Sequence, residues 1–178
     1  MTDIPAAYGA TAAGGARTGA GAPAVMSHAA AIVRHDLARE VAMGTWDTGP
    51  FDNDSAADWC GALDDAAPGE RLAMIRQALT EAADTTGFLD DREGVRAIAA
   101  AAIVLSQRPG AEPLTSAYAP DFLLDGGSVV IPDDVAALAV RALDRVMGDD
   151  SEWRESWEEG GGEDALAVVR DLRSALAG

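Results

Sequence analysis

The segment from Met43 to Trp59, MGTWDTGPFDNDSAADW, brings four aspartates and three aromatic side chains close together in the 178-residue chain. Closely spaced carboxylates can bind Mg²⁺ or Ca²⁺ together with loop carbonyls, which makes Asp52, Asp54 and Asp58 weak candidates for metal ligands. The Asp-Asn-Asp run begins like a calcium-binding loop, but Ala57 stands where such a loop needs glycine, and no glutamate occupies its closing position. The segment therefore does not predict an EF-hand.

The same segment can form a recognition surface, because exposed acids and aromatic rings around a tight loop offer contacts to a partner. The structural alternative, which we favour, is that its glycines turn the chain, its rings anchor the loop in the core and its Asp-Asn-Asp run begins a helix. The candidate recognition residues are Trp46, Asp47, Phe51, Asp52, Asn53, Asp54, Asp58 and Trp59.

Composition excludes much of the side-chain chemistry used in catalysis. Both histidines, His28 and His35, precede Met43, the chain has no lysine, and Cys60 is its one cysteine. These absences remove Ser-His-Asp and Cys-His catalysis, zinc sites built from imidazoles or several thiolates, Schiff-base chemistry and a Walker A lysine. Cys60 is interpreted as a small buried residue. We predict no catalytic residue and no cofactor, and the chain leans toward a protein that is not an enzyme.

Two further patterns each have a structural and a functional interpretation. Four Asp-Asp pairs occur, at 64–65, 90–91, 133–134 and 149–150. Three of them precede predicted helices, where aspartate caps free N–H groups, so we favour capping over cation binding. Trp153 and Trp157, one helical turn apart, can form an aromatic binding edge, but we favour a role in anchoring a short helix to the core.

The net charge is strongly negative, −17 from 30 acidic residues and 13 arginines, and all of it lies after residue 42. Such a charge repels phosphate backbones and anionic lipid head groups, so neither nucleic acid nor a membrane is predicted as a partner. A basic protein is electrostatically favoured, although acidity also serves solubility. One cysteine allows no intramolecular disulfide, and no secretory signal pattern opens the chain, so we expect a cytoplasmic location.

Helical periodicity dominates the acidic part of the chain, and the predicted fold class is mostly α, a compact bundle of about five or six helices. The uncharged Ala-rich stretch at 97–105 indicates the central, most buried helix. A long Pro/Gly-containing connection follows at 109–131, with at most one short strand, at 128–131. Helices are expected at 55–63, 70–83, 91–107, 133–147, from 151 onward around the two tryptophans, and at 163–176.

The helix starts carry recognisable capping residues. Asp54 or Ser55 is expected to cap the first helix, and Ser151 is expected to cap the helix that holds the two tryptophans. On one face of the 133–147 helix we expect apolar side chains, with Arg141 and Arg145 on the opposite, solvent-facing side.

Residues 1–42 differ in composition from the rest, being Ala/Gly-rich and nearly neutral. They are expected to form a flexible leader, in which the apolar spacing permits a helix at 27–42. Residues 43–178 are expected to form a single acidic helical domain.

Three short runs resemble the opening signature of a bacterial family catalogued as a domain of unknown function, number 4259. They are Met43 to Trp46, Gly49 to Asp54 and Ala57 to Trp59. Looser similarity continues at 131–134 and 151–159, and Asp47 stands where the family often has glycine. The resemblance implies that the natural domain begins at Met43, so residues 1–42 are either an extension or the product of a wrongly chosen start codon. It implies no reaction, so it assigns no functional residue.

Our leading hypothesis is a non-catalytic acidic domain that binds a basic cytoplasmic protein, as a regulator or an immunity-like inhibitor. The first alternative is a hydrolase that depends on carboxylates and a divalent metal, using Asp52, Asp54 and Asp58. The second is a structural subunit of a homo-oligomer.

Overall fold

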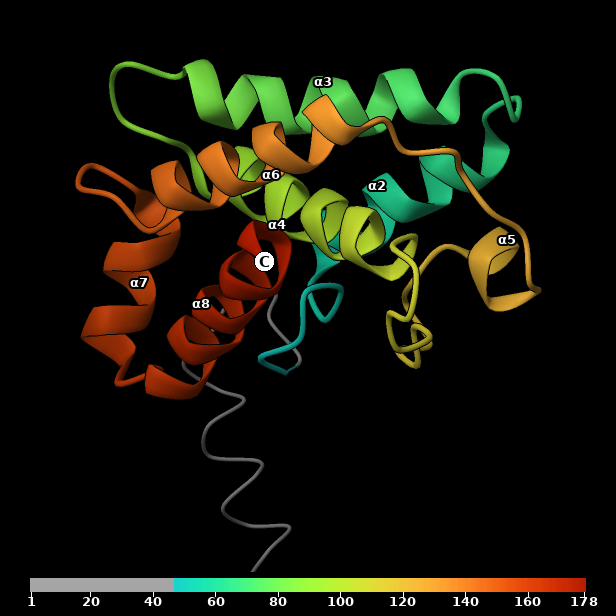
Figure 1. The fold of residues 1–178 in the computed structure, drawn as a ribbon. Coiled ribbons are helices and arrows are strands. Elements are labelled where there is room, and N and C mark those ends of the chain that lie inside the picture. The colour runs from blue at the N-terminus through green and yellow to red at the C-terminus, as the bar shows by residue number, and fades with distance from the viewer. Residues whose placement is uncertain (1–46) are drawn as a thin grey trace, which may run out of the picture.

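The computed structural model describes residues 47–178, which form seven helices and no β-sheet (Figure 1). The expected leader at 1–42, its helix at 27–42 and the start of the domain at Met43 lie outside the described residues. The helices are α2 (Asp54–Asp65), α3 (Arg71–Asp84), α4 (Asp91–Ser106), α5 (Asp121–Leu124), α6 (Asp133–Val146), α7 (Glu152–Gly160) and α8 (Glu163–Ala177). The mostly helical bundle is confirmed, and the helix that the sequence did not predict is the single turn α5.

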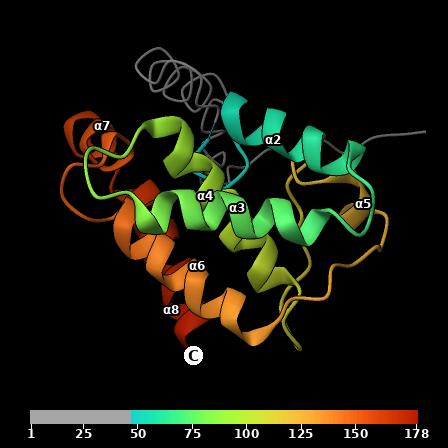
Figure 2. The same ribbon diagram turned by 90° about the horizontal axis from the view of Figure 1, so that it is seen from above.

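Helix α4 is the centre of the bundle, as the Ala-rich stretch predicts. It packs against α2, α3, α6, α7 and α8, and ten of its sixteen residues are buried. Figure 1 shows α3 and α6 above α4 and α8 below it, and Figure 2 shows the same crossing helices from above. The methyl side chains of residues 99–102 are all buried, and their small size allows neighbouring helices to approach α4 closely.

The apolar stripes of the outer helices supply the rest of the core. In α6 the predicted stripe is confirmed, because Val135, Leu138 and Val146 are buried. In α8 the stripe is buried from Val169 to Leu176, while Leu166 is only partly covered. Each fully buried side chain of this size contributes about 1.5 to 3 kcal/mol, so these stripes are what holds the outer helices to α4.

Two of the predicted caps are wrong in detail. Asn53, not Asp54 or Ser55, caps α2: its side-chain oxygen accepts the N–H of Ala56 at 2.8 Å. The capping residue must precede the helix in an extended conformation, and Asn53 does so with φ −151° and ψ 158°. Ser151 does occupy the N-cap position of α7, but its buried hydroxyl has no hydrogen-bond partner within residues 47–178.

The sequence allowed at most one short strand, at 128–131, and the structure has none there. That segment runs from α5 to α6 without regular structure. The N–H of Val129 donates to the side chain of Gln107, the C-cap of α4, at 3.0 Å, and the Val129 side chain is buried in the core. Helix α5 is fastened by Asp64, whose carboxylate accepts the N–H groups of Asp121 and Phe122 at 2.9 and 3.0 Å. Asp64 therefore caps a helix that is distant in sequence, which its position at the end of α2 gives no reason to expect.

Arg145 joins the two loops that lead into α4 and α7. Its guanidinium donates to the carbonyl oxygens of Thr85 and Gly87 in one loop and of Asp149 and Asp150 in the other. Beside this contact the N–H of Leu89 donates to the Asp150 oxygen at 2.8 Å, within a parallel bridge between Leu89 and Ser151. The side chain expected to face solvent is thus a clamp between two loops.

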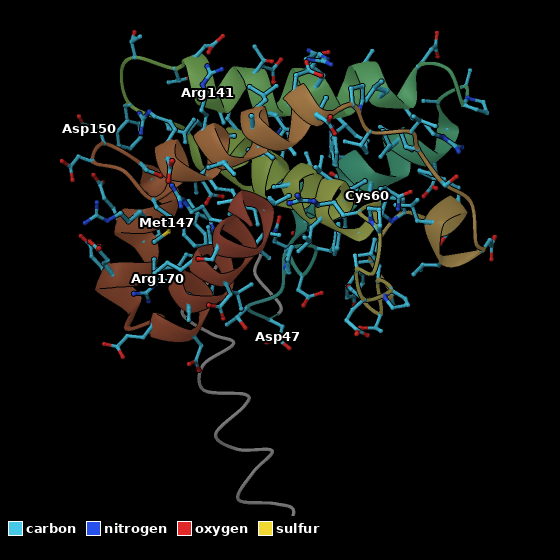
Figure 3. All side chains as sticks on the ribbon, in the orientation of Figure 1. Asp47, Cys60, Arg141, Met147, Asp150 and Arg170 are labelled. Atoms are coloured by element: carbon cyan, nitrogen blue, oxygen red, sulfur yellow. The ribbon has the colours of Figure 1, made fainter. Side chains whose placement is uncertain are left out.

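Asp150 completes the clamp with an unusual backbone conformation. Its φ is 58°, in the left-handed region that aspartate adopts more readily than most residues other than glycine. The Asp150 carbonyl oxygen in this conformation accepts hydrogen bonds from both Arg145 and Leu89. In Figure 3, Asp150 lies on the loop that connects α6 to α7.

Replacing Arg145 by lysine is expected to lower the free energy of unfolding by about 2 to 3 kcal/mol, because an ammonium group lacks the planar fork that reaches several carbonyls at once. Arg141→Lys, one turn earlier on α6, is the matched control, because the Arg141–Asp84 ion pair is exposed at both ends. Urea unfolding followed by circular dichroism measures both variants. Equal, small effects of the two substitutions would show that the clamp does not stabilise the fold.

Candidate functional site

The loop that carries the predicted recognition residues is a closed turn. The N–H of Asp52 donates to the Gly49 carbonyl at 3.2 Å, and the N–H of Thr48 donates to the Asp47 carboxylate at 2.7 Å. A side chain at Gly49 would force the Asp52 carboxylate to move. The hydroxyl of Ser116 donates to Asp52 at 3.0 Å and ties the loop to the long connection.

The predicted recognition residues separate into a buried and an exposed group. Phe51 and Trp59 are core residues, 2% and 9% exposed, which agrees with the favoured structural interpretation and removes these two rings from the alternative, an exposed recognition surface. Trp59 shares one face of α2 with other buried residues, and burial of a ring of this size outweighs what surface contact would offer. Trp46 lies outside the described residues.

The acidic members of the set do not converge on one point. Asp52 is half-buried and bound to Ser116, whereas Asp54 and Asp58 are exposed on α2. Across residues 47–178 no three histidine, cysteine or acidic side chains are grouped closely enough to hold a metal ion.

The loop does meet α4, α7 and α8 around a small cavity. The cavity encloses about 30 Å³, enough for one or two water molecules. It is lined by Asp47, Thr48, Gly49, Pro50, Asn53, Asp91, Val95, Ile98, Trp153, Trp157 and Val169. The structure therefore combines two features that the sequence showed separately, the acidic loop and the tryptophan pair.

The tryptophan pair forms the indole wall of this cavity. The two ring centroids are 6.3 Å apart and tilted by 57°. Trp153 is buried and its Cβ would lie 3.4 Å from a Cβ at Gly94, while Trp157 is only partly buried and packs against Gly162. A side chain at Gly162 would clash with that ring, and Gly161 before it has a φ of 72°, so both positions after α7 favour glycine. Anchoring is therefore confirmed for Trp153, and Trp157 retains an accessible part.

Asp91 places a half-buried carboxyl group in the cavity wall. Burial raises its pKa, and the nearby charges of Glu152 and Asp90 raise it further. The sequence suggested that both residues of the Asp-Asp pair act as caps. Asp90 does so, accepting the N–H of Arg92 at 2.9 Å, whereas the N–H of Asp91 donates to the Glu152 carboxylate at 2.9 Å. An anion held beside indole rings favours a cationic group as its neighbour.

The surface next to the cavity is strongly acidic. We call residues 152–164, which comprise α7, its glycine turn and the start of α8, the acidic corner. Arg154 is the one basic residue in this range and is already bound to Asp149 and Glu158. The corner's acids are Glu152, Glu155, Glu158, Glu159, Glu163 and Asp164. Asp47, at the lower edge of the molecule in Figure 3, adds another exposed carboxylate to the same side.

Cys60 does not belong to this site. It is buried in α2, which confirms its interpretation as a small core residue. Burial and the nearby Asp64 carboxylate raise its pKa to about 12, so the thiol stays protonated at neutral pH.

Asp91→Asn is expected to raise the free energy of unfolding at pH 7. The pKa of Asp91 is higher in the folded protein than in the unfolded chain, so its ionisation favours unfolding, and the stability present at low pH is lost as the pH rises through the folded pKa. Asparagine cannot ionise, so the variant should be more stable than the unchanged protein at pH 7. This difference in the free energy of unfolding should fade as the pH falls toward about 4. Chemical unfolding at the two pH values measures the change.

The control is Asp133→Asn, because Asp133 is the exposed first residue of α6 and occupies the position equivalent to Asp91 in α4. It should not stabilise the protein at pH 7, since it loses only a favourable interaction with the helix dipole. A loss of stability in Asp91→Asn as large as in this control would contradict the proposed effect of burial.

Within residues 47–178 no helix has the length and apolar character that a membrane-spanning helix requires.

Comparison with known proteins identifies a family for this chain but no close relative. A search of curated proteins and a search of solved structures gave no match. The family model described as "Domain of unknown function (DUF4259)" matches residues 44–168, which include the loop, α4 and α7. The match covers well over half of the chain, and the protein therefore belongs to the DUF4259 family.

Proposed function

We propose that the protein is a non-catalytic acidic domain that binds a basic cytoplasmic protein and thereby regulates or inhibits it. The observation that carries this proposal is the acidic corner, where six acidic residues and one arginine lie beside a partly exposed tryptophan and a half-buried aspartate. A cationic surface would satisfy this arrangement by charge and by contact with the indole ring.

The distribution of arginine supports the proposal. Residues 47–178 hold 27 acidic residues and ten arginines. Four of these arginines form the five ion pairs of the described residues, and four others donate to backbone carbonyls. Most carboxylates therefore have no arginine beside them in the part of the chain that the structure describes. Such an excess attracts a basic partner over a distance comparable with the Debye length, about 8 to 10 Å at physiological salt.

The first test uses the full chain immobilised on a support and exposed to lysate of the source cells at low and at moderate salt. We expect one basic protein to be retained in stoichiometric amount at low salt and largely released at moderate salt, because screening weakens exposed charge pairs. Mass spectrometry identifies it. Retention that is equal at both salt concentrations, or no specific retention at either, would contradict the proposal.

The second test locates the contact on the molecule with the partner so identified. A variant with Glu155→Gln, Glu159→Gln and Asp164→Asn removes three exposed charges from the acidic corner, and we expect it to bind about tenfold more weakly at low salt. The matched control, Asp65→Asn, Glu70→Gln and Glu81→Gln, removes three exposed charges from the ends and outer face of α2 and α3. Equal losses in both variants would show that net charge, and not the acidic corner, drives binding.

A further inference from the structure

A second hollow lies away from the acidic corner, where the long connection passes the end of α4. We call it the connection groove. Its volume is about 420 Å³, within the size range of sites that accept small ligands or a few side chains. It is lined by Ser106, Gln107, Ala111, Pro113, Leu114, Leu123, Leu124, Gly126 and Gly127. Five of these nine residues are apolar, so the groove offers aliphatic contact in addition to its polar backbone.

The walls of the groove are held in place by contacts to the bundle. The side chain of Gln107 accepts the N–H of Val129, and Arg108 donates to the carbonyls of Ala175 and Leu176 at 3.2 and 2.7 Å. Arg71 stacks over the ring of Phe122 at 3.7 Å, which holds α5 against the start of α3. The groove is therefore preformed, and a ligand need not order it first.

The glycine pair after α5 exposes backbone in the groove wall. Gly126 has φ 84°, and a side chain at Gly127 would collide with the Phe122 carbonyl, so both positions need glycine. The N–H of Gly126 donates to the Leu123 carbonyl, and the N–H of Gly127 donates to the Phe122 carbonyl. Among the described residues, the carbonyl oxygens of the two glycines accept no backbone hydrogen bond. These two carbonyls are acceptors within residues that line the groove, and a ligand with N–H donors suits them.

The rim of the groove is acidic. Arg108 is the one basic residue between positions 97 and 140, and its guanidinium is occupied by the carbonyls of α8. Glu112 and Asp125 are exposed, and each stands between two lining residues in the sequence. Leu124 and Val130 are also uncovered, at 41% and 86% exposure, so apolar contact surface lies directly among these charges.

We propose that the connection groove docks a short segment of a basic partner protein in which leucine-like side chains alternate with arginine or lysine. The apolar side chains would enter the groove, and the cations would meet the acidic rim and the glycine carbonyls. A second copy of this chain fits less well, because its own acidic rim would face the same charges. This inference rests on the proposed function, since it assigns a second contact on the same kind of partner.

The test uses two fluorescein-labelled peptides of equal charge, Arg-Leu-Arg-Leu-Arg and Arg-Ser-Arg-Ser-Arg, with the full chain and fluorescence anisotropy at low salt. We expect the leucine peptide to bind at least about fivefold more tightly, because it buries apolar area in the groove. In ¹⁵N-resolved NMR spectra the leucine peptide should shift the amide signals of Leu114, Leu124, Gly126 and Gly127. Equal affinities of the two peptides, or no binding of either, would overturn the proposal.

Variants separate this contact from the acidic corner. Leu124→Ser should lower the affinity for the leucine peptide about fivefold and leave the affinity for the serine peptide unchanged. Phe88→Ser, which removes another exposed apolar side chain outside the groove, should change neither. If the leucine peptide shifted only the amide signals of residues 152–164, docking in the connection groove would be refuted, and the result would agree with the proposed function. If the leucine peptide bound in the groove with an affinity independent of salt, the groove would be supported as a docking site. The electrostatic basis of the proposed function would then be contradicted.

Discussion

The guanidinium of Arg145 is the point on which the arrangement of the candidate site depends. Four backbone carbonyls from two loops meet on it, and these loops set where α4 and α7 begin. The start of α4 carries Asp91, and α7 carries both tryptophans and most of the acidic corner. A charged group shared among carbonyls gains more per hydrogen bond than a neutral donor would. In a chain without lysine, arginine is the side chain that can make such a contact.

Much of the fold could be predicted from local pattern. The apolar spacing of α6 and the Ala-rich stretch of α4 indicate their position in the core, because burial of these stripes dominates the energetics. Turns and caps were less predictable. Asn53 and Asp54 are both good caps by residue type, and the choice between them depends on the backbone at the start of α2. Helix α5 depends on Asp64, a contact across 57 residues that local periodicity does not encode.

The candidate site was predictable only in part. The acidic loop and the tryptophan pair are visible in the sequence, but their meeting around one cavity depends on how α7 packs against α4. By residue type and spacing, Phe51 and Trp59 could have been exposed recognition residues. The structure buries Trp59 on the inner face of α2 and Phe51 in the turn before that helix. The inward-facing position of Asp91 could not be predicted, because the sequence of an Asp-Asp pair before a helix does not show which carboxylate caps the helix and which faces inward.

The Arg145 clamp has a consequence for how this sequence can change without loss of the fold. Its acceptors are main-chain carbonyls, which every residue type supplies, so the loop residues 85–87 can vary in side chain without breaking the contact. Covariation between Arg145 and those positions would therefore carry little trace of the contact. The exception is position 150, where the left-handed backbone narrows the tolerated residues to aspartate, asparagine and glycine. Among the residues of this contact, only positions 145 and 150 would then be restricted in residue type, although the contact joins two loops.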